Sequence, residues 1–557
     1  MYISEYIIET LYKNGIDTYF LLTGGAIAPF VDALSKNSKI KYYCFQHEQS
    51  ASMAVEGYYR TSGKIGVVCV TSGPGVQNIL NGVCGCWYDS IPAFFITGQV
   101  NTNESLNTLS CMPRQNGFQE MPVIELFSKI TKKSLYADNK ENIPKIIEEL
   151  LFNLFTPRYG PVLIDLPVNI QMEKIESDHL YVHKNIEHTN TNEFNIDDYI
   201  NKSKRPLIII GHGVKLSHSI KESLKFAEDK KIPFVVTWGA IDICNTNHPL
   251  RIGSPGVYGD RVSNFAIQNS DLLIIIGARL DSRQIGNKKL FSKYSKKIMI
   301  DIDENEINKF DNLIDYKIIN DIKFFFNNLK YEKNTNFEDW LNTIEKWKNK
   351  FRNEPDSSVY KYLNNFFKEI PDNSIIVTDT GGSLAWTMQT ANINNTHKLF
   401  SNFGNSSMGF ALPAAIGSAI ADETRKVYCI SGDGGIQLNI QDLLTVNKYN
   451  LNIEIIILNN NGYGMIKQFQ DGYFKSNYIA TNFTDIFNYH IDFEGIAKSY
   501  GVKTLKNIII PEDQKIYPKL EFGNSLENMS PYLKREDLEN ELIVDFPHKI
   551  SRSGWVN

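Results

Sequence analysis

Short apolar runs alternate with longer amphipathic stretches along most of the chain, and this pattern predicts repeated strand–helix units. In residues 1–172, helical stretches punctuated by Gly or Pro separate the apolar runs. Such alternation is typical of a mostly parallel sheet with helices between its strands. The strands expected in this first block are Tyr19–Leu22, Tyr42–Phe45, Ile65–Thr71, Ala93–Thr97 and Pro161–Asp165.

Two further blocks repeat the same α/β rhythm. A polar stretch over 173–204 is interpreted as a linker, and a charged helical region over 331–356 as a linker helix. The tail, 511–557, has few periodic features and is interpreted as an extended C-terminal arm. The second block, 205–330, has apolar runs at 205–210, Pro233–Thr237, Leu272–Gly277 and Ile298–Asp303, and the third, 357–510, has them at Ile375–Asp379, Val427–Ile430 and Ile453–Leu458.

The bulk composition narrows the class of protein but not its chemistry. The 557 residues, 42% hydrophobic and 22% charged, fit a protein of roughly three or four domains with sizeable cores. A net charge of −5 gives no reason to expect a nucleic-acid partner. No apolar run reaches the roughly 18 residues of a membrane span, and the N-terminus resembles neither a signal nor a transit peptide. Seven scattered Cys form no zinc-type set, so we expect free thiols and a cytoplasmic protein.

The polar residues that follow two apolar runs of the third block carry the most specific chemistry. Val427–Ile430 leads into a segment containing Gly432-Asp433-Gly434, a helix is expected over Ile436–Lys448, and Ile453–Leu458 then leads into Asn459-Asn460. Parallel strands would deliver both segments to one edge of a sheet. Carboxylate and amide oxygens suit Mg²⁺ or Ca²⁺ bound with a phosphate, and the glycines free backbone N–H groups to face phosphate oxygens.

Taken separately, these two motifs have simpler interpretations. Asp433 could be the N-cap of a helix, and the second motif could be an Asn-Gly turn. Together, with a strand–helix–strand between them, they resemble the signature of thiamine diphosphate enzymes. That resemblance implies that Asp433, Asn460 and the carbonyl of Gly462 hold a metal ion bridging to the cofactor's diphosphate.

A carboxylate in the first block, Glu48, lies where a strand ends near Phe45 and a helix begins. Alone, such a residue is usually a capping or dipole-complementing group. Thiamine chemistry favours another role, because loss of the thiazolium C2 proton requires a carboxylic acid hydrogen-bonded to N1′ of the pyrimidine. A Glu with a raised pKa in a dry pocket meets that requirement, so we expect Glu48 to be catalytic.

With these residues in place, the resemblance extends over about residues 1–505 to the acetolactate (acetohydroxyacid) synthase branch of that family. It is carried by HEQSASMAVEGYYRTSGKIGVVCVTSGPGVQNILNGV, FFITGQV, FQEMPVIELFSKITKKS, GPVLIDLPVNIQ, SMGFALPAAIGSAIA, GDGGIQLNIQDLLTV and NNNGYGMIKQF. As a set these stretches are specific to the superfamily, and less specific to one reaction within it.

The resemblance implies three doubly wound parallel-sheet domains: pyrimidine-binding (1–172), central (205–330) and diphosphate-binding (357–510). It also implies a homodimer or homotetramer, in which Glu48 of one chain would meet Asp433 and Asn460 of another. Met408 would be the apolar wedge that bends the cofactor, and Phe118 and Gln119 would reach into the active site. The implied cofactor-binding residues are Gly25, Glu48, Pro74, Asn78, Thr380, Gly381, Gly382, Ser406, Met408, Gly432, Asp433, Gly434, Gly435, Asn460, Gly462, Tyr463, Gly464 and Met465.

The central block resembles the FAD-binding domain of the same branch. Gly211-His212-Gly213 alone is only part of a dinucleotide fingerprint, and related central domains also occur without flavin. Both interpretations, an FAD-binding and a flavin-free domain, therefore stay open. The residues implied for FAD are Gly211, Gly213, Thr237, Trp238, Gly239, Gly277, Arg279, Asp281, Arg283, Asp301 and Ile302.

Several positions depart from the synthase pattern. Val168 replaces a Lys near the entrance for the second substrate, and Phe469 replaces a channel Trp. After Asp379, the synthase pattern has Gly-Gln-His where this chain has Gly381-Gly382-Ser383, so two polar side chains near the diphosphate are lost. Ser406 replaces a Gly whose carbonyl would contact the 4′-amino group of the cofactor. The cofactor half of the site is thus retained, whereas the acceptor half is altered.

We therefore expect a thiamine diphosphate- and Mg²⁺-dependent carboligase, or lyase, that decarboxylates a 2-keto acid, pyruvate above all. The two-carbon unit would pass to a second carbonyl, with acetolactate as the default product. The alternatives are ligation to a keto-sugar nucleotide, simple decarboxylation, a flavin-dependent pyruvate oxidase and a non-catalytic homologue that binds the cofactor.

Overall fold

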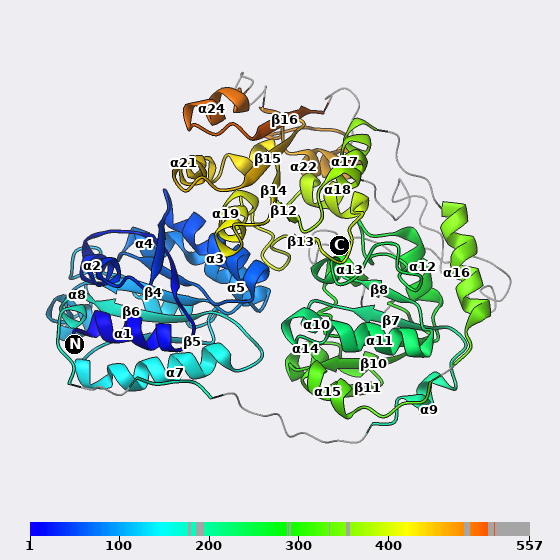
Figure 1. Cartoon of the computed structure of the whole chain (residues 1–557), viewed down its shortest axis with the longest axis horizontal. Helices are drawn as coiled ribbons and strands as arrows, with labels where there is room; N and C mark the ends of the chain where they lie inside the picture. The colour runs from blue at the N-terminus through cyan, green and yellow to red at the C-terminus, as the bar shows by residue number, and fades with distance from the viewer. Residues whose placement is uncertain are drawn as a thin grey trace.

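The computed structural model describes residues 1–176, 180–184, 194–286, 288, 291–333, 335–351, 357–483, 491–510 and 517–518. The chain forms three α/β domains, each built on one parallel sheet. In Figure 1 the N-terminal domain (blue to cyan) and the central domain (green) lie side by side below the C-terminal domain (yellow to orange). The predicted fold class is confirmed.

The N-terminal domain contains a six-stranded sheet in the order β2-β1-β3-β4-β6-β5, with every pair parallel. Its central strands are apolar on both faces because helices cover both faces. Phe20, for example, packs into the core shared with the C-terminal domain, whereas its neighbours Tyr19 and Leu21 pack against α1 and α7. The elements are β1 (Thr18–Leu22), β2 (Lys41–Cys44), β3 (Val67–Val70), β4 (Phe94–Gln99), β5 (Lys133–Tyr136), β6 (Val162–Pro167), α1 (Ile3–Lys13), α2 (Ala28–Lys36), α3 (Glu48–Ser62), α4 (Pro74–Asn78), α5 (Leu80–Tyr88), α6 (Val123–Phe127), α7 (Ile143–Phe155) and α8 (Val168–Gln171).

The central domain has a five-stranded sheet in the order β11-β10-β9-β7-β8. The strand order reverses beside β7, which pairs with β8 on one side and with β9 on the other. The elements are β7 (Pro206–Ile210), β8 (Phe234–Val236), β9 (Leu272–Ile276), β10 (Lys296–Asp301), β11 (Tyr316–Ile319), α9 (Asp197–Ile200), α10 (Gly213–Leu216), α11 (Ile220–Lys230), α12 (Arg261–Asn269), α13 (Ser282–Ile285), α14 (Glu304–Asn308), α15 (Ile322–Asn328) and α16 (Glu338–Phe351).

The C-terminal domain has a five-stranded sheet in the order β13-β12-β14-β15-β16. Its strands β12, β14 and β15 are consecutive neighbours, so their carboxyl ends lie at one edge. The elements are β12 (Ile375–Thr378), β13 (Lys398–Phe400), β14 (Val427–Gly432), β15 (Ile453–Asn459), β16 (Leu505–Ile509), α17 (Ser358–Glu369), α18 (Gly382–Thr390), α19 (Ala411–Ala421), α20 (Asp433–Ile436), α21 (Leu443–Lys448), α22 (Gly464–Tyr473) and α24 (Phe493–Ser499).

The structure differs from the sequence-based expectations in three places. The helix expected over Ile436–Lys448 is broken into α20, a 3₁₀ turn (Ile440–Asp442) and α21, because Asn439 leaves the helical conformation. The stretch interpreted as a linker over 173–204 contains α9, and Ile200 is fully buried in the core of the central domain. Strands β5, β11, β13 and β16 were not predicted.

Two residues of the predicted C-terminal arm, Tyr517 and Pro518, are described, and the rest of 511–557 lies outside the described residues. The Tyr517 hydroxyl donates to Asp471 at 2.7 Å, and Gln468 Nε2 donates to the Pro518 carbonyl at 3.0 Å. This part of the tail therefore contacts α22. Among the described helices, none is long and apolar enough to cross a membrane.

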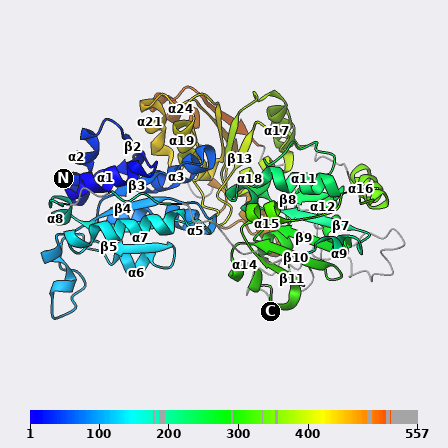
Figure 2. The same ribbon diagram turned by 60° about the horizontal axis from the view of Figure 1, so that its bottom comes forward.

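The N-terminal and C-terminal domains are joined by the close packing of α3 against α19, visible between the blue and yellow domains in Figures 1 and 2. A Cβ atom at Gly57 would lie 2.0 Å from the Ala414 carbonyl oxygen, and one at Gly417 would lie 1.9 Å from that of Ala54. Both distances are far below van der Waals contact, so the backbones can approach only because these positions lack side chains.

We predict that Gly57→Ala separates α3 from α19 and lowers the free energy of unfolding by about 3 kcal/mol, at the upper end of typical overpacking costs. The measurement is chemical denaturation followed by circular dichroism. The matched control is Gly472→Ala in α22, where the added Cβ meets no atom within 4 Å. This control should be neutral or slightly stabilising, and equal stability of the two variants would contradict the packing argument.

A candidate cofactor and metal site

The candidate site lies at the carboxyl edge of the C-terminal sheet. The segments after β12, β14 and β15 contain, respectively, the predicted residues Thr380–Gly382, Gly432–Gly435 and Asn460–Met465. Since these strands are parallel neighbours, the three segments end at the same edge, where open α/β sheets bind ligands. The structure therefore brings together the predicted residues of this domain.

Three oxygen acceptors converge at this edge. Asp433 is 2% exposed, and its carboxylate accepts hydrogen bonds from Gly462 N at 2.9 Å and Gly434 N at 3.0 Å. The Asn460 amide lies against the Gly462 carbonyl oxygen at 2.9 Å and Asp433 Oδ1 at 3.3 Å, and its NH₂ group donates to both when it is turned toward them. With a cation present, the opposite orientation would direct the Asn460 oxygen at the ion beside the Asp433 and Gly462 oxygens. The oxygen set predicted for the metal thus fits Mg²⁺.

The burial of the Asp433 carboxyl group also supports a cation at this position. Burial raises the pKa of Asp433 to about 7 in the absence of a cation, although two backbone N–H groups oppose the shift. A divalent ion at this position would favour the ionised carboxylate, since an opposite charge in contact is the strongest compensation for burial.

Glycines line the space beside these oxygens. A Cβ at Gly432 would meet no atom within 4 Å, and one at Gly381 would meet only Met465 Cγ at 3.8 Å. Gly25 is equally open, but it follows β1 of the N-terminal domain and does not belong to this edge. Gly381 has a φ of +81°, which also favours glycine. Open space bounded by exposed backbone N–H groups is what a diphosphate requires, so the cradle fits the phosphate end of the predicted cofactor.

A buried carboxylate that the sequence analysis did not select, Asp379, organises this edge. Asp379 is 1% exposed and accepts hydrogen bonds from Thr380 N at 2.8 Å, Gly409 N at 3.0 Å and Ser431 Oγ at 2.9 Å. Burial raises the pKa of Asp379 to about 6. Its position directly after β12, equivalent to that of Asp433 at the end of β14, was the available signal.

Residues from the N-terminal domain form a second part of the site. Glu48 is 7% exposed at the first turn of α3, and Asn78 Nδ2 donates to its Oε2 at 2.9 Å. The cap of α3 is His47, whose Nδ1 accepts from Gln49 N at 3.1 Å, so Glu48 itself is free of the capping role. A Cβ at Gly75 would lie 3.4 Å from Glu48 Oε1, which places the first turn of α4 against this carboxylate.

The predicted pair Phe118 and Gln119 belongs to a long loop between β4 and α6, which protrudes from the domain in Figure 2. Phe118 is 85% exposed, and Gln119 has a φ of +64°, a sparsely populated conformation for a non-glycine residue. Glu120 holds the base of the loop by accepting from Leu106 N at 2.7 Å and Gly117 N at 3.1 Å. The loop is thus built around one carboxylate and presents Phe118 outward.

One chain presents these two parts separately. Within the residues that the structure describes, no hydrogen bond or ion pair joins Glu48 to Asp433 or Asn460. One link between the two domains near the site is Asn439, whose Oδ1 accepts from Ser50 at 3.0 Å and whose Nδ2 donates to the Gly409 carbonyl at 2.8 Å. Asn439 was also not selected from the sequence.

A cavity lies where the central domain meets the other two. It is lined at the carboxyl ends of β7, β8, β9 and β10, beside the point where the strand order reverses. A Cβ at Gly211 would lie 2.1 Å from the Gly277 carbonyl oxygen, so the loops after β7 and β9 approach only as glycines. The predicted residues that line the cavity are Gly213, Thr237, Gly239, Gly277, Arg279, Asp301 and Ile302.

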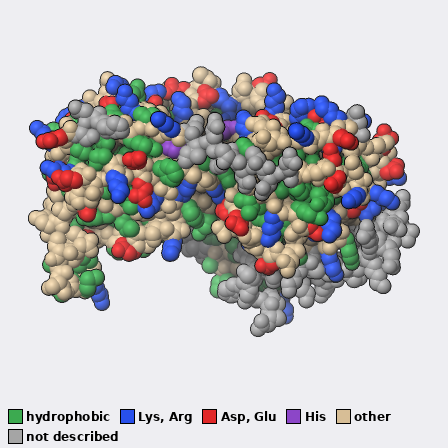
Figure 3. Space-filling model, turned by 90° about the horizontal axis from the view of Figure 1, so that it is seen from below, with side chains coloured by type: hydrophobic (Ala, Val, Ile, Leu, Met, Phe, Trp, Pro, Cys, Tyr) green, Lys and Arg blue, Asp and Glu red, His purple; other side chains and the backbone are tan. Residues whose placement is uncertain are grey.

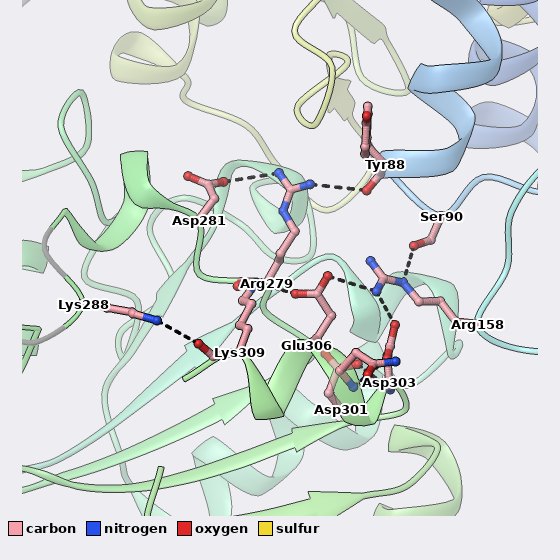
Figure 4. A network of polar contacts seen from close by, with 11 residues as sticks. Tyr88, Ser90, Arg158, Arg279, Asp281, Lys288, Asp301, Asp303, Glu306 and Lys309 are labelled. Carbon is pink, nitrogen blue, oxygen red and sulfur yellow. Dashed lines mark hydrogen bonds and ion pairs between the residues drawn. The ribbon is translucent and has the colours of Figure 1, made fainter. Parts of the chain in front are cut away.

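Charged residues from two domains surround this cavity (Figure 4). Arg158 of the N-terminal domain donates to Asp303 at 2.7 Å and to Ser90 at 2.8 Å, and Arg279 reaches the Tyr88 carbonyl at 3.4 Å. Burial raises the pKa of Asp301 at the end of β10. No sequence motif indicates Arg158, because its ion pair with Asp303 forms only where two domains meet.

Four of the residues predicted for FAD do not line the cavity: Gly211, Trp238, Asp281 and Arg283. Gly211 instead permits the close approach to Gly277. Asp281 is the N-cap of α13 and accepts from Arg283 N at 2.8 Å and Gln284 N at 3.2 Å. The Arg283 side chain is exposed.

Seen from below in Figure 3, acidic and basic side chains are interspersed over the surface around these domains.

Comparison with known proteins matches this chain to three models of thiamine pyrophosphate enzymes. The N-terminal TPP binding domain matches residues 1–126, the central domain residues 195–329, and the C-terminal TPP binding domain residues 379–522. The acetolactate synthase large subunit of Lactococcus lactis subsp. lactis (strain IL1403) is 32% identical over 520 residues, covering 90% of this chain and 88% of its own.

Two other relatives extend the comparison. The probable acetolactate synthase large subunit of Methanococcus aeolicus is 33% identical, with 90% of this chain and 86% of its own covered. The chloroplastic acetolactate synthase of Arabidopsis thaliana is 32% identical, with 85% and 72% covered. The chain therefore belongs to the thiamine pyrophosphate enzyme family, in the branch that contains the acetolactate synthase large subunits.

Proposed function

We propose that this protein is a thiamine diphosphate- and Mg²⁺-dependent enzyme that decarboxylates pyruvate and joins the two-carbon unit to a second carbonyl compound. The observation that carries the proposal is the convergence of Asp433, Asn460 and Gly462 oxygens beside a glycine-lined opening. Such a set holds a cation together with a phosphate. The acetolactate synthases among the relatives support the reaction class.

When bound, thiamine diphosphate supplies a thiazolium that acts as an electron sink for the carbanion left by decarboxylation. The chain's own contribution to holding it is positional. Asp433, Asn460 and the Gly462 carbonyl would hold Mg²⁺, and the segments containing Gly381 and Gly432–Gly435 would bind the diphosphate. The Ser406 carbonyl would accept from the aminopyrimidine, and Met408 would support the bent cofactor.

Glu48 handles the proton that starts the reaction. Its carboxyl group would share a proton with the pyrimidine ring nitrogen, and Asn78, at 2.9 Å, orients the second oxygen. Only a carboxyl group both buried and fixed in direction performs this task efficiently. The 7% exposure of Glu48 and its place in the first turn of α3 meet both conditions.

The proposed enzyme is at least a homodimer, and a tetramer is compatible with the same geometry. Glu48 and the metal oxygens are not in contact within one chain, and Phe118 is 85% exposed on a protruding loop. A second copy would cover Phe118 and complete the site. We further propose that the protein acts in the cytoplasm, in keeping with seven free cysteines.

The cavity of the central domain is proposed to bind FAD. Asp301 at the end of β10 is placed to accept from a ribose hydroxyl, as acidic residues do in other doubly wound domains. The glycine loops Gly211–Gly213 and Gly277 leave backbone close to the opening, which suits a pyrophosphate. Arg279, at the mouth of the cavity, supplies a positive charge for it.

The acceptor is proposed to differ from the second pyruvate of a standard synthase. Val168 begins α8, and the adjacent Asn169 accepts from Thr102 N at 2.9 Å. Position 168 therefore lies beside the base of the loop that carries Phe118. Losing a Lys there removes a positive charge that would attract a keto-acid carboxylate, and favours a larger acceptor such as a keto-sugar nucleotide.

We predict that the purified protein with thiamine diphosphate and Mg²⁺ releases CO₂ from 1-labelled pyruvate. Glu48→Gln should fold normally and lower this rate roughly 10²- to 10⁴-fold, the range of general acid–base contributions. Release of labelled CO₂ is the measurement, with Glu148→Gln, an exposed Glu of α7, as the control.

Product analysis of the same reaction separates the candidate activities. Acetolactate, acetoin or an adduct with a supplied keto-sugar nucleotide indicates ligation. Acetaldehyde alone indicates a decarboxylase, and peroxide formed with phosphate indicates an oxidase. A wild-type protein that binds the cofactor yet releases no CO₂ would be a non-catalytic homologue.

Asp433→Asn should weaken Mg²⁺-dependent binding of thiamine diphosphate at least 10²-fold in calorimetry, with Asp372→Asn as the exposed control. The metal-free variant should also be more thermostable than wild type above pH 7. The carboxyl pKa is 3.8 ordinarily and about 7 when folded, so ionisation destabilises the wild type increasingly between these values. Unchanged cofactor affinity would remove Asp433 from the metal site.

Val168→Lys should raise the yield of acetolactate from pyruvate alone at least threefold relative to acetaldehyde. The restored ammonium would attract the carboxylate of a second pyruvate. Val168→Met adds similar length without charge and should not change the product ratio. If both variants behave like wild type, position 168 does not select the acceptor.

A further inference from the structure

The buried guanidinium of Arg60, in α3, lies where all three domains meet. Its Nε donates to Glu56 Oε1 at 2.8 Å, and its Nη2 contacts Asp89 Oδ2 at 2.6 Å. Side-chain exposure is 3% for Arg60, 0% for Glu56 and 6% for Asp89. Arg60 Nη1 also lies 3.5 Å from His212 Nε2 of the central domain. Two carboxylates are therefore held in fixed directions by one guanidinium.

The second oxygen of Glu56 reaches into the C-terminal domain. Asn402 Nδ2 donates to Glu56 Oε2 at 2.9 Å, and Asn402 is 2% exposed. Gly85 of α5 makes room for this contact, since a Cβ there would lie 2.3 Å from Asn402 Nδ2 and 3.0 Å from Glu56 Oε2. The carboxylate thus decides which way the Asn402 amide faces.

The other end of the Asn402 amide holds a loop of the cofactor site. Its Oδ1 accepts from Asn405 N at 3.1 Å and from Ser406 N at 2.9 Å. Ser406 has a φ of +54°, in the left-handed region that is strained for a non-glycine residue. Two hydrogen bonds from one buried acceptor offset that strain. They also set the direction of the Ser406 carbonyl.

Ser406 is then connected to the first loop of the site. Its hydroxyl lies 2.5 Å from Thr380 Oγ1, and Thr380 N donates to Asp379 at 2.8 Å. If the Asn402 amide turned over, its NH₂ group would face the two backbone N–H groups, and Ser406 would relax toward an ordinary conformation. The Ser406 carbonyl would then point elsewhere.

We propose that Glu56 and Asn402 are positioning residues that turn the Ser406 carbonyl toward the aminopyrimidine of the cofactor. This inference rests on the proposed function, because it concerns the same cofactor. The Glu56 carboxylate accepts from the Asn402 NH₂ group and so sets the orientation of the amide. The Asn402 oxygen then accepts from Ser406 N and sets the conformation of that residue.

The test exchanges the two functional groups. Asn402→Asp alone places a carboxylate oxygen against Glu56, and should weaken Mg²⁺-dependent thiamine diphosphate binding at least tenfold in calorimetry. The double variant Asn402→Asp/Glu56→Gln restores a donor between the two residues, keeps an acceptor for Ser406 N and leaves the total charge unchanged. Its cofactor affinity should return to within threefold of wild type.

Thermal unfolding without cofactor distinguishes positioning from simple support of the fold. Asn394→Ala is the matched control, because Asn394 also donates to a carboxylate, Asp372 Oδ1, at 2.6 Å but lies outside the site. Asn402→Ala provides a second variant if the Asp variant does not fold, and it should weaken cofactor binding at least tenfold while Asn394→Ala leaves it unchanged.

The proposal is overturned if Asn402→Asp or Asn402→Ala binds the cofactor like wild type. It is also overturned if the double variant regains the wild-type unfolding temperature but not the affinity. Failure of the wild-type protein itself to bind thiamine diphosphate would instead refute the proposed function, so the two failures are distinguishable.

Discussion

The architecture of the site depends on how closely α3 and α19 approach each other. At Gly57 and Gly417 the absence of a Cβ atom lets each backbone contact a carbonyl group of the other helix. Helix α3 begins with Glu48 and carries Glu56 and Arg60 further along, while α19 directly follows the loop that contains Ser406, Met408 and Gly409. A displacement of either helix would therefore move the N-terminal domain, which carries Glu48, relative to this loop of the C-terminal domain.

Much of the fold could be predicted from the sequence because strands buried on both faces are continuous apolar runs. The four strands that were not predicted, β5, β11, β13 and β16, all lie at the edges of their sheets. An edge strand pairs on one side only and is partly exposed, so polar side chains can interrupt its apolar pattern without being buried. Such residues are Lys133, Lys317, Lys398 and Asn507. Periodicity alone misses such strands for a physical reason.

The site could be predicted where its residues follow one another in a motif, as Gly432-Asp433-Gly434 and Asn460 do. It could not be predicted where a side chain acts through contacts between domains. Asn402 gains its role from Glu56 and Arg158 from Asp303, and no local spacing indicates either pair. Asn439 breaks an expected helix because its amide joins Ser50 to Gly409. Asp379 is the exception, since its place after β12 was readable.

Three of the buried carboxylates, Glu56, Asp379 and Asp433, differ in what surrounds them. Burial raises the pKa of Glu56, and Arg60 and Asn402 oppose that shift. Asp379 accepts hydrogen bonds from three donors, Thr380 N, Gly409 N and Ser431 Oγ. Asp433 has two backbone donors, and its Oδ1 also lies 3.3 Å from the Asn460 amide. Among these three, Asp433 is the one whose neighbours include two further oxygen-bearing groups, the Asn460 amide and the Gly462 carbonyl, which is the kind of set a hard cation binds.

A similar contrast separates the buried residues of the candidate site from those at its exposed loop. Asp433, Asp379, Glu48 and Asn402 are buried, and each is fixed by partners from other elements, so a substitution there disturbs several contacts. Val168 and Phe118 lie beside or on a protruding loop whose structure depends mainly on Glu120. A change at that loop alters what enters the site without disturbing the residues that hold the cofactor. The acceptor is therefore the part of the reaction that such a protein can change at the smallest cost in stability.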